Sequence, residues 1–333
     1  MPRFLRVCTV LIALCFAAMA HAQSHDNAIR SAAEAQDPEV IAYAQGHDNT
    51  IRHAAETGDP EAQANLGVLY AKGLGVEHNF AEALKWFRKA ADQGVAEAQH
   101  NLGAMYNKGL GVARDHTEAV KWFRKAAEQK FAAAQYNLGN MYLHGKGVDK
   151  NDEEAAKWFQ LAAEQGDIDA QYNLGNMYLH GKGVRQNDEE AVKWFRLAAE
   201  QKYAPAQYNL GNMYLNGKGV GKNYEEAVKW FRLATEQNDV DAQYNLGNMY
   251  LSGKGVDQND AEAAKWFRLA AEQGDVDAQY NLGNLYLNGK GVSKSDAEAM
   301  KWFGMAAKQG DADAQNALKS IEAAKKKTPA AVK

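Results

Sequence analysis

Cysteine is almost missing from this 333-residue chain, which contains only Cys8 and Cys15. Both lie in an N-terminal segment that we expect to be removed from the mature protein. The folded part therefore has no disulfide framework and no thiol chemistry. Its stability must come from packing, and hydrophobic residues, at 46% of the sequence, are sufficient for a core.

An excess of basic charge is also missing, since 38 Lys and Arg residues stand against 42 Asp and Glu residues. Nucleic-acid-binding proteins usually have a basic stripe, so this balance argues against a nucleic-acid partner. Long apolar runs are scarce as well. The run from Val7 to Ala18 is too short to cross a bilayer comfortably, and no second run follows. We expect no membrane span in the mature chain.

Catalytic and metal-binding motifs are missing too. The sequence has no His-Glu-x-x-His motif, no phosphate-binding loop and no nucleophile elbow. His144 and His180 are equivalent positions 36 residues apart, but the next equivalents are Asn216, Ser252 and Asn288, so no histidine cluster forms. We therefore predict that the protein is not an enzyme and has no catalytic residue, no metal site and no cofactor.

The N-terminus has the pattern of a signal peptide. Arg3 and Arg6 precede the apolar run, and Ala20-His21-Ala22 follows it as a small-x-small cleavage site. We predict a signal peptide over residues 1–22 and a periplasmic or secreted protein. Removing two arginines leaves 36 basic against 42 acidic residues, a formal charge of −6. A lipoprotein anchored at Cys15 is a less favoured alternative, because Leu14 stands where a small residue is wanted.

The rest of the chain is a repeat with a period of 36 residues. All seven tryptophans keep this spacing: Trp86, Trp122, Trp158, Trp194, Trp230, Trp266 and Trp302. An Asn-Leu-Gly triplet keeps it as well. The seven predicted units are 59–94, 95–130, 131–166, 167–202, 203–238, 239–274 and 275–310. They follow one another without insertions, which is the pattern of a solenoid.

Each unit predicts two helices joined by a tight loop. In unit 131–166, apolar residues have helical spacing in both halves, and Gly145-Lys146-Gly147 separates them. Gly145 is expected to end the first helix in the left-handed conformation. The second helices begin after predicted N-caps, with a glutamate three residues later, a capping-box pattern. These caps are Asn79, Asp115, Asn151, Asn187, Asn223, Asn259 and Ser295.

Other cap positions follow the same register. The second helices end at Gly94, Gly166, Gly274, Gly310 or Asn238, whereas Lys130 and Lys202 are expected to close less tightly. Aspartates are the predicted N-caps of several first helices: Asp59, Asp167, Asp239, Asp275 and Asp311. Residues 23–58 resemble degenerate capping helices, 311–325 a lone C-terminal capping helix, and 326–333 a disordered tail.

The motif Ala-x-Ala-Gln-Tyr-Asn-Leu-Gly-x-Met-Tyr, then Gly-x-Gly-Val, then Glu-Ala-x-Lys-Trp-Phe-x-x-Ala-Ala, resembles the Sel1-like repeat (SLR), a subclass of the tetratricopeptide repeat. The match covers about residues 59–320. The resemblance implies an all-α fold, a right-handed α/α superhelical solenoid of seven repeats with degenerate end caps. It also implies an adaptor that binds a protein in a groove lined by the first helices, in some bacterial relatives a host protein.

In tetratricopeptide repeats the groove is lined by particular first-helix positions, and these carry tyrosine and asparagine here. The tyrosine stripe is Tyr136, Tyr172, Tyr208, Tyr244 and Tyr280. The triplet stripe is Asn137, Asn173, Asn209, Asn245 and Asn281, and a second asparagine stripe is Asn140, Asn176, Asn212, Asn248 and Asn284. We call these residues the Asn/Tyr ladder and predict that it binds an extended peptide or protein segment.

Two alternatives remain open. The ladder residues can instead pack between repeats or bond neighbouring loops, and for the tryptophans packing is the expected role. A branch of the family linked to penicillin binding suggests a cell-wall enzyme or penicillin-binding factor as the alternative function. That branch has paired cysteines, which this chain lacks.

Overall fold

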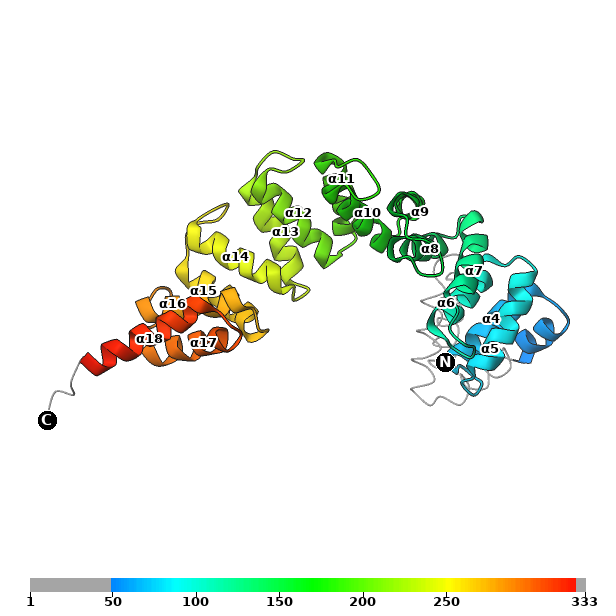
Figure 1. The fold of residues 1–333 in the computed structure, drawn as a ribbon, viewed down its shortest axis with the longest axis horizontal. Coiled ribbons are helices and arrows are strands. Elements are labelled where there is room, and N and C mark those ends of the chain that lie inside the picture. Colours follow the sequence, from blue (N-terminus) through cyan, green and yellow to red (C-terminus); the bar gives the residue numbers. More distant parts are fainter. Residues whose placement is uncertain (1–48, 328–333) are drawn as a thin grey trace, which may run out of the picture. The chain divides into compact units, whose positions relative to one another are not determined.

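The computed structural model describes residues 49–327. The predicted signal peptide 1–22, residues 23–48 of the predicted N-terminal cap, and residues 328–333 lie outside the described residues. Between 49 and 327 every regular element is a helix and there is no strand. The prediction of an all-α repeat solenoid is confirmed (Figure 1).

Residues 49–56 are helical and precede the first complete repeat. The first helices of the seven repeats are α4 (Pro60–Lys72), α6 (Ala96–Lys108), α8 (Ala132–His144), α10 (Ile168–His180), α12 (Ala204–Asn216), α14 (Val240–Ser252) and α16 (Val276–Asn288). The second helices are α5 (Phe80–Asp92), α7 (His116–Glu128), α9 (Asp152–Glu164), α11 (Asp188–Glu200), α13 (Tyr224–Thr235), α15 (Asp260–Glu272) and α17 (Asp296–Lys308). The last helix is α18 (Ala312–Lys327), where the prediction had placed a cap over 311–325.

The described chain divides into two compact units. The first contains residues up to Met141 together with Gly145–Asp149, and the second contains Tyr142–His144 and the residues from Lys150 onward. In the first unit α4 packs on α5, α5 on α6, and α6 on α7. In the second unit each helix from α9 to α18 packs on the next one along the chain. Each helix pair thus buries its apolar face on its neighbours, as a solenoid requires.

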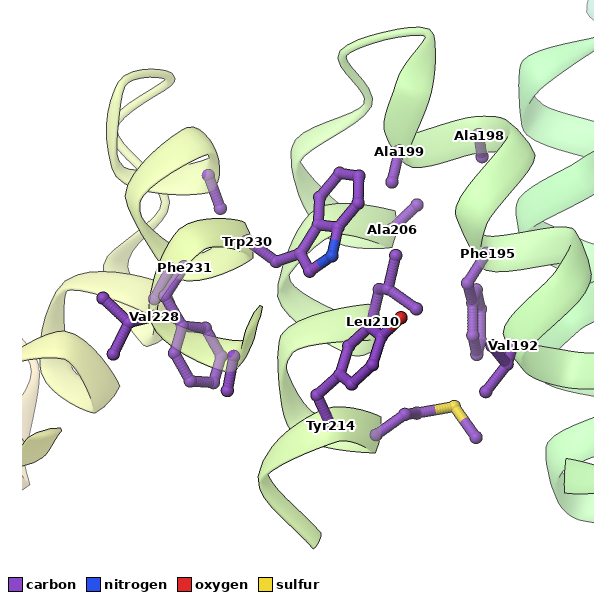
Figure 2. Close-up of a cluster of buried hydrophobic side chains, with 14 of the residues drawn as sticks. Val192, Phe195, Ala198, Ala199, Ala206, Leu210, Tyr214, Val228, Trp230 and Phe231 are labelled. Atoms are coloured by element: carbon purple, nitrogen blue, oxygen red, sulfur yellow. The ribbon is translucent and has the colours of Figure 1, made fainter. Parts of the chain in front are cut away.

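In the core of the second unit, each repeat contributes a phenylalanine, a leucine and several alanines, together with other apolar side chains such as methionine and tryptophan. Phe195, Leu210 and Phe231 are all fully buried. In Figure 2, Leu210 and Tyr214 of α12 lie between Phe195 of α11 on one side and Trp230 and Phe231 of α13 on the other. The three helices of adjacent repeats therefore share one continuous core.

The triplet glycine allows the two helices of a repeat to approach closely. A Cβ atom on Gly211 of α12 would lie 2.7 Å from the Phe231 ring of α13. The equivalent glycines face the equivalent phenylalanines at 2.7–2.8 Å, at Gly67, Gly103, Gly175, Gly247 and Gly283. The ring occupies the space that a side chain would need, so only glycine fits at this position.

The second loop glycine packs one repeat on the previous one. Gly183 has φ of 67°, and a Cβ there would lie 2.0 Å from the Asp152 carbonyl oxygen at the start of α9. The structure shows that this glycine is required for close contact between repeats.

The predicted N-caps of the second helices are confirmed, but only half of the capping box forms. Asn223 Oδ1 accepts from the Glu226 backbone N–H at 3.0 Å, as the motif predicts. The Asn223 N–H, however, donates to the Tyr214 carbonyl of the preceding helix at 3.0 Å. The Glu226 carboxylate pairs instead with Lys229 at 3.4 Å. The reciprocal bond fails because the tight loop has already provided a backbone acceptor.

Each of the seven second helices is followed closely by a residue in the left-handed conformation. Gly94, Gly166, Gly274 and Gly310 have φ between 91° and 99°. Lys130, Lys202 and Asn238 also have positive φ, at 63°, 65° and 64°. The prediction that the two lysines depart from this geometry was wrong. They adopt it at a conformational cost, because a Cβ atom disfavours the left-handed region.

Candidate partner-binding face

The tyrosines of the ladder lie half-buried on the first helices. Each ring rests against the core phenylalanine of its own repeat, with centroids 5.8 Å apart for Tyr172 and Phe195 and 6.1 Å apart for Tyr208 and Phe231. The pairs Tyr244–Phe267 and Tyr280–Phe303 repeat this contact at 5.9 and 5.7 Å. One side of each ring is therefore used in packing, and the remaining surface is accessible.

The triplet asparagine can reach the tyrosine position of the preceding repeat. In the first unit, Asn137 Nδ2 lies 2.8 Å from Nε2 of His100, which occupies the tyrosine position of its repeat. In the second unit, burial raises the pKa of Tyr208, and hydrogen bonds with the side chains of Asn212 and Asn245 partly oppose this effect. Ladder residues of adjacent repeats thus meet, which supports part of the packing alternative.

Other asparagines of the ladder are not committed to such contacts. The side-chain amides of Asn173, Asn209 and Asn281 are half-buried and make no hydrogen bond within the part of the chain that the structure describes. In the second stripe, Asn176 Nδ2 donates to the Tyr172 carbonyl oxygen at 3.1 Å. The remaining predicted site residues, Tyr136, Asn140, Asn248 and Asn284, are also half-buried on their first helices.

His100 is a local departure from the ladder. Its ring packs on Phe123 and Phe131, with centroids 5.7 and 5.3 Å away. Burial lowers its pKa, an effect that a hydrogen bond with Asn101 partly opposes. The imidazole therefore takes the place of the tyrosine ring that the five later repeats have.

Sequence reasoning missed a second ladder, made of buried glutamines on the first helices. Gln207 Nε2 donates to the Ala199 carbonyl of the preceding repeat at 3.1 Å, and its Oε1 accepts from Gln237 Nε2 at 2.9 Å. The residues at this position are at most 5% exposed: Gln63, Gln99, Gln135, Gln171, Gln207, Gln243 and Gln279. Their invariant place in the repeat was a signal that could have found them. Their bonds hold repeats together and leave them unavailable to a partner.

Four tryptophans are buried in the core, and Trp86 and Trp266 are partly buried against it, which is the role predicted for these residues. Trp122, Trp194, Trp230 and Trp302 are no more than 7% exposed. Within residues 49–327, no three His, Cys, Asp or Glu residues are grouped so that they could hold a metal ion. No helix in the same range is both long and apolar enough to cross a bilayer.

Comparison with known proteins agrees with the repeat register. The sequence model of the Sel1 repeat matches residues 60–95, 96–131, 132–167, 168–203, 204–239, 240–275 and 276–311. These ranges begin one residue after the units read from the sequence. No curated protein matches the chain.

Two solved structures are similar over most of the chain. One is c5321, a protective antigen present in uropathogenic Escherichia coli strains and displaying an SLR fold, with 36% identity and a TM-score of 0.81. The match covers 88% of this chain and 66% of that protein, so the chain spans about two thirds of the relative's length. The other is a Sel1 repeat protein from Oxalobacter formigenes, with 38% identity, a TM-score of 0.65, and 86% and 82% of the two chains covered. This chain belongs to the Sel1 repeat family.

Proposed function

We propose that this protein is an exported, non-enzymatic scaffold that binds an extended protein segment along the Asn/Tyr ladder. The observation that carries the proposal is the state of Asn173, Asn209 and Asn281. These amides are half-buried, repeat in register and make no hydrogen bond within the described residues. A half-buried amide without a protein partner can exchange its water for a ligand at little cost.

The chemistry of asparagine suits a peptide backbone. Each side-chain amide has one acceptor and two donors, which match the carbonyl and N–H groups of an extended chain. One amide per repeat provides regularly spaced bonds that depend little on the side chains of the partner. The tyrosines next to them add contact area with little entropy loss, because a tyrosine has only two side-chain torsions.

The family supports a protein partner, since Sel1 repeat solenoids are commonly protein-interaction scaffolds. Export is proposed from the N-terminal sequence, with Ala20-His21-Ala22 as the cleavage site. The similar protein c5321 is a protective antigen present in uropathogenic strains. That supports a periplasmic or secreted location and a partner in the cell envelope or in a host.

The test is affinity capture with mature protein 23–333 from periplasmic extract and from host material. A ladder variant carries alanine at Asn173, Asn209, Asn245 and Asn281. A matched control carries alanine at Asn216 and Asn288, which are exposed at the ends of α12 and α16. Circular dichroism confirms that both variants are folded. We expect one protein to be retained by the native form and the control and lost by the ladder variant. Equal retention by all three forms would refute the ladder as the binding face.

A further inference from the structure

A contact that recurs between repeats of this chain shows how the fold holds a guanidinium group. An arginine near the end of one second helix donates to the hydroxyl of a tyrosine on the next first helix. Arg196 Nη2 lies 2.7 Å from the Tyr214 hydroxyl, and Arg232 Nη2 lies 2.7 Å from that of Tyr250. Arg88 with Tyr106 and Arg268 with Tyr286 form the same bond. In all four pairs the guanidinium lies over the ring, 5.7–5.9 Å from its centroid.

Arg88 is also close to two further side chains of the following repeat. Arg88 also lies over Trp122, 5.9 Å from the ring centroid. Its charge helps to lower the pKa of Glu118, after the larger effect of the bond from Lys121. At this junction the guanidinium thus bonds to a tyrosine, lies over a tryptophan and is close enough to a glutamate to affect its pKa, all three in the following repeat. We call this set the guanidinium seat.

At one junction of the second unit, between α9 and α10, the residues of the guanidinium seat are present but the arginine is replaced by glutamine. Gln160 of α9 stands at the arginine position, and its Nε2 donates to Glu164 of its own helix at 2.9 Å. The other members are in place as Tyr178, Glu190 and Trp194. Within the described residues no group donates a hydrogen bond to the Tyr178 hydroxyl.

An open hollow lies beside Tyr178, in the repeat that follows this junction. Its volume is about 770 Å³, and it is lined by Tyr178, Val184, Arg185, Gln186, Asn187 and Glu190. Two members of the seat, the tyrosine and the glutamate, therefore face the hollow. It is large enough to admit the side chain of another molecule together with its neighbouring backbone.

We propose that this hollow, the Tyr178 seat, binds the guanidinium group of an arginine side chain supplied by a protein partner. The guest would donate to the Tyr178 hydroxyl, lie over its ring and face the Glu190 carboxylate, as Arg88 does in the first unit. The site lies apart from the Asn/Tyr ladder and shares no residue with it. It can therefore exist whether or not the ladder binds a segment.

The charges around the hollow indicate which residue should lie next to the arginine of the partner. Lys193 pairs with Glu190 at 3.3 Å, and Arg185 lines the rim. No other repeat has a basic residue at the position of Arg185; its equivalents are Glu77, Ala113, Asp149, Gly221, Asp257 and Ser293. A second cation beside a guest arginine is unfavourable unless an anion separates them. We therefore expect an acidic residue next to the arginine of the partner, paired with Arg185.

The test uses mature protein 23–333 and the peptide acetyl-Gly-Gly-Arg-Glu-Gly-amide, with ¹³C at the arginine Cζ, titrated by NMR. Control peptides carry citrulline, which has the same shape without the charge, or lysine. We expect saturable binding at one site per chain for the arginine peptide. The citrulline peptide should bind at least tenfold more weakly. Equal binding of the arginine and citrulline peptides would overturn the proposal.

Three variants then locate the site. Gln160→Arg supplies the fold's own arginine and should weaken binding at least tenfold, whereas Gln160→Ala should leave it unchanged. Arg196→Gln opens the equivalent seat at Tyr214 and should raise the stoichiometry from one peptide to two. Circular dichroism shows whether each variant is folded. Undiminished binding by a folded Gln160→Arg variant, or an unchanged stoichiometry for Arg196→Gln, would contradict the assignment.

Discussion

The left-handed residue that closes each second helix allows a quantitative test of how the repeat is stabilised. Lys202 holds this conformation with φ of 65°, and its N–H donates to the Ala199 carbonyl oxygen at 3.0 Å. Four other repeats have glycine at this position. The left-handed region costs a non-glycine residue about 1–2 kcal/mol. Glycine avoids this cost, but the greater freedom of glycine in the unfolded chain lowers the free energy of unfolding by about 0.5–1 kcal/mol.

We therefore expect Lys202→Gly to stabilise the protein by about 0.5–1 kcal/mol. Lys130→Gly should do the same, and the two effects should add because the sites are far apart in sequence and do not share partners. The measurement is the urea concentration at the midpoint of unfolding, followed by circular dichroism. Repeat arrays can unfold in steps, so the slope of the transition is compared as well.

Gly166→Ala is the matched reverse change. A Cβ atom there would have nothing within 4 Å, so any loss of stability reports on the backbone alone. We expect a lower midpoint for this variant and a higher one for Lys202→Gly. If neither variant moves the midpoint, the left-handed closure does not contribute to stability and the reasoning is refuted.

Three further predictions follow from contacts in the core. Gly211→Ala should destabilise the protein by about 1–3 kcal/mol, since its Cβ would lie 2.7 Å from the Phe231 ring; an unchanged midpoint of urea unfolding would contradict this. Gln207→Leu should cost about 0.5–1.5 kcal/mol because its hydrogen bond to the Ala199 carbonyl is lost while that carbonyl keeps the Lys202 N–H as a donor, and a stabilised variant in the same assay would show that the buried glutamines are dispensable. The third concerns His100, whose pKa is lowered in the folded state. The unfolded chain binds the proton more tightly, so stability present above about pH 6.5 should be lost as the pH falls below that value. His100→Tyr, which restores the residue of later repeats, should weaken this dependence in thermal melts, and an identical pH profile would argue against the assignment.

The sequence was sufficient for the fold because the repeat period determines so much. A step of 36 residues with helical spacing in each half leaves few architectures, and the caps at Asn223 and Asp239 form as their residue types suggest. The reciprocal bond of the capping box at Glu226 does not form, because the Asn223 N–H donates to the Tyr214 carbonyl across the loop and not to the Glu226 carboxylate. Such competition is a matter of tertiary geometry, which a local motif does not contain.

The candidate site was predictable only in part. Register alone assigns Tyr208 and Asn245 to one face, but not the hydrogen bond that joins them across a repeat boundary. The glutamine ladder is as regular as the tyrosine stripe, and only burial shows that Gln207 is a structural residue. The substitution at Gln160 is visible in the sequence. Its meaning emerges only when arginines at the same position are seen to contact the next repeat.

The measurement that most directly tests the central claim uses a segment captured by the native protein and lost by the ladder variant. The segment is synthesised with N-methyl groups at alternate backbone nitrogens, which removes donors and keeps the side chains. If the Asn/Tyr ladder recognises backbone, N-methylation at one set of alternate positions should weaken binding at least tenfold, whereas alanine at single side chains should change it less than threefold. Full affinity after N-methylation of each of the two sets in turn, together with loss on a single side-chain change, would contradict the account.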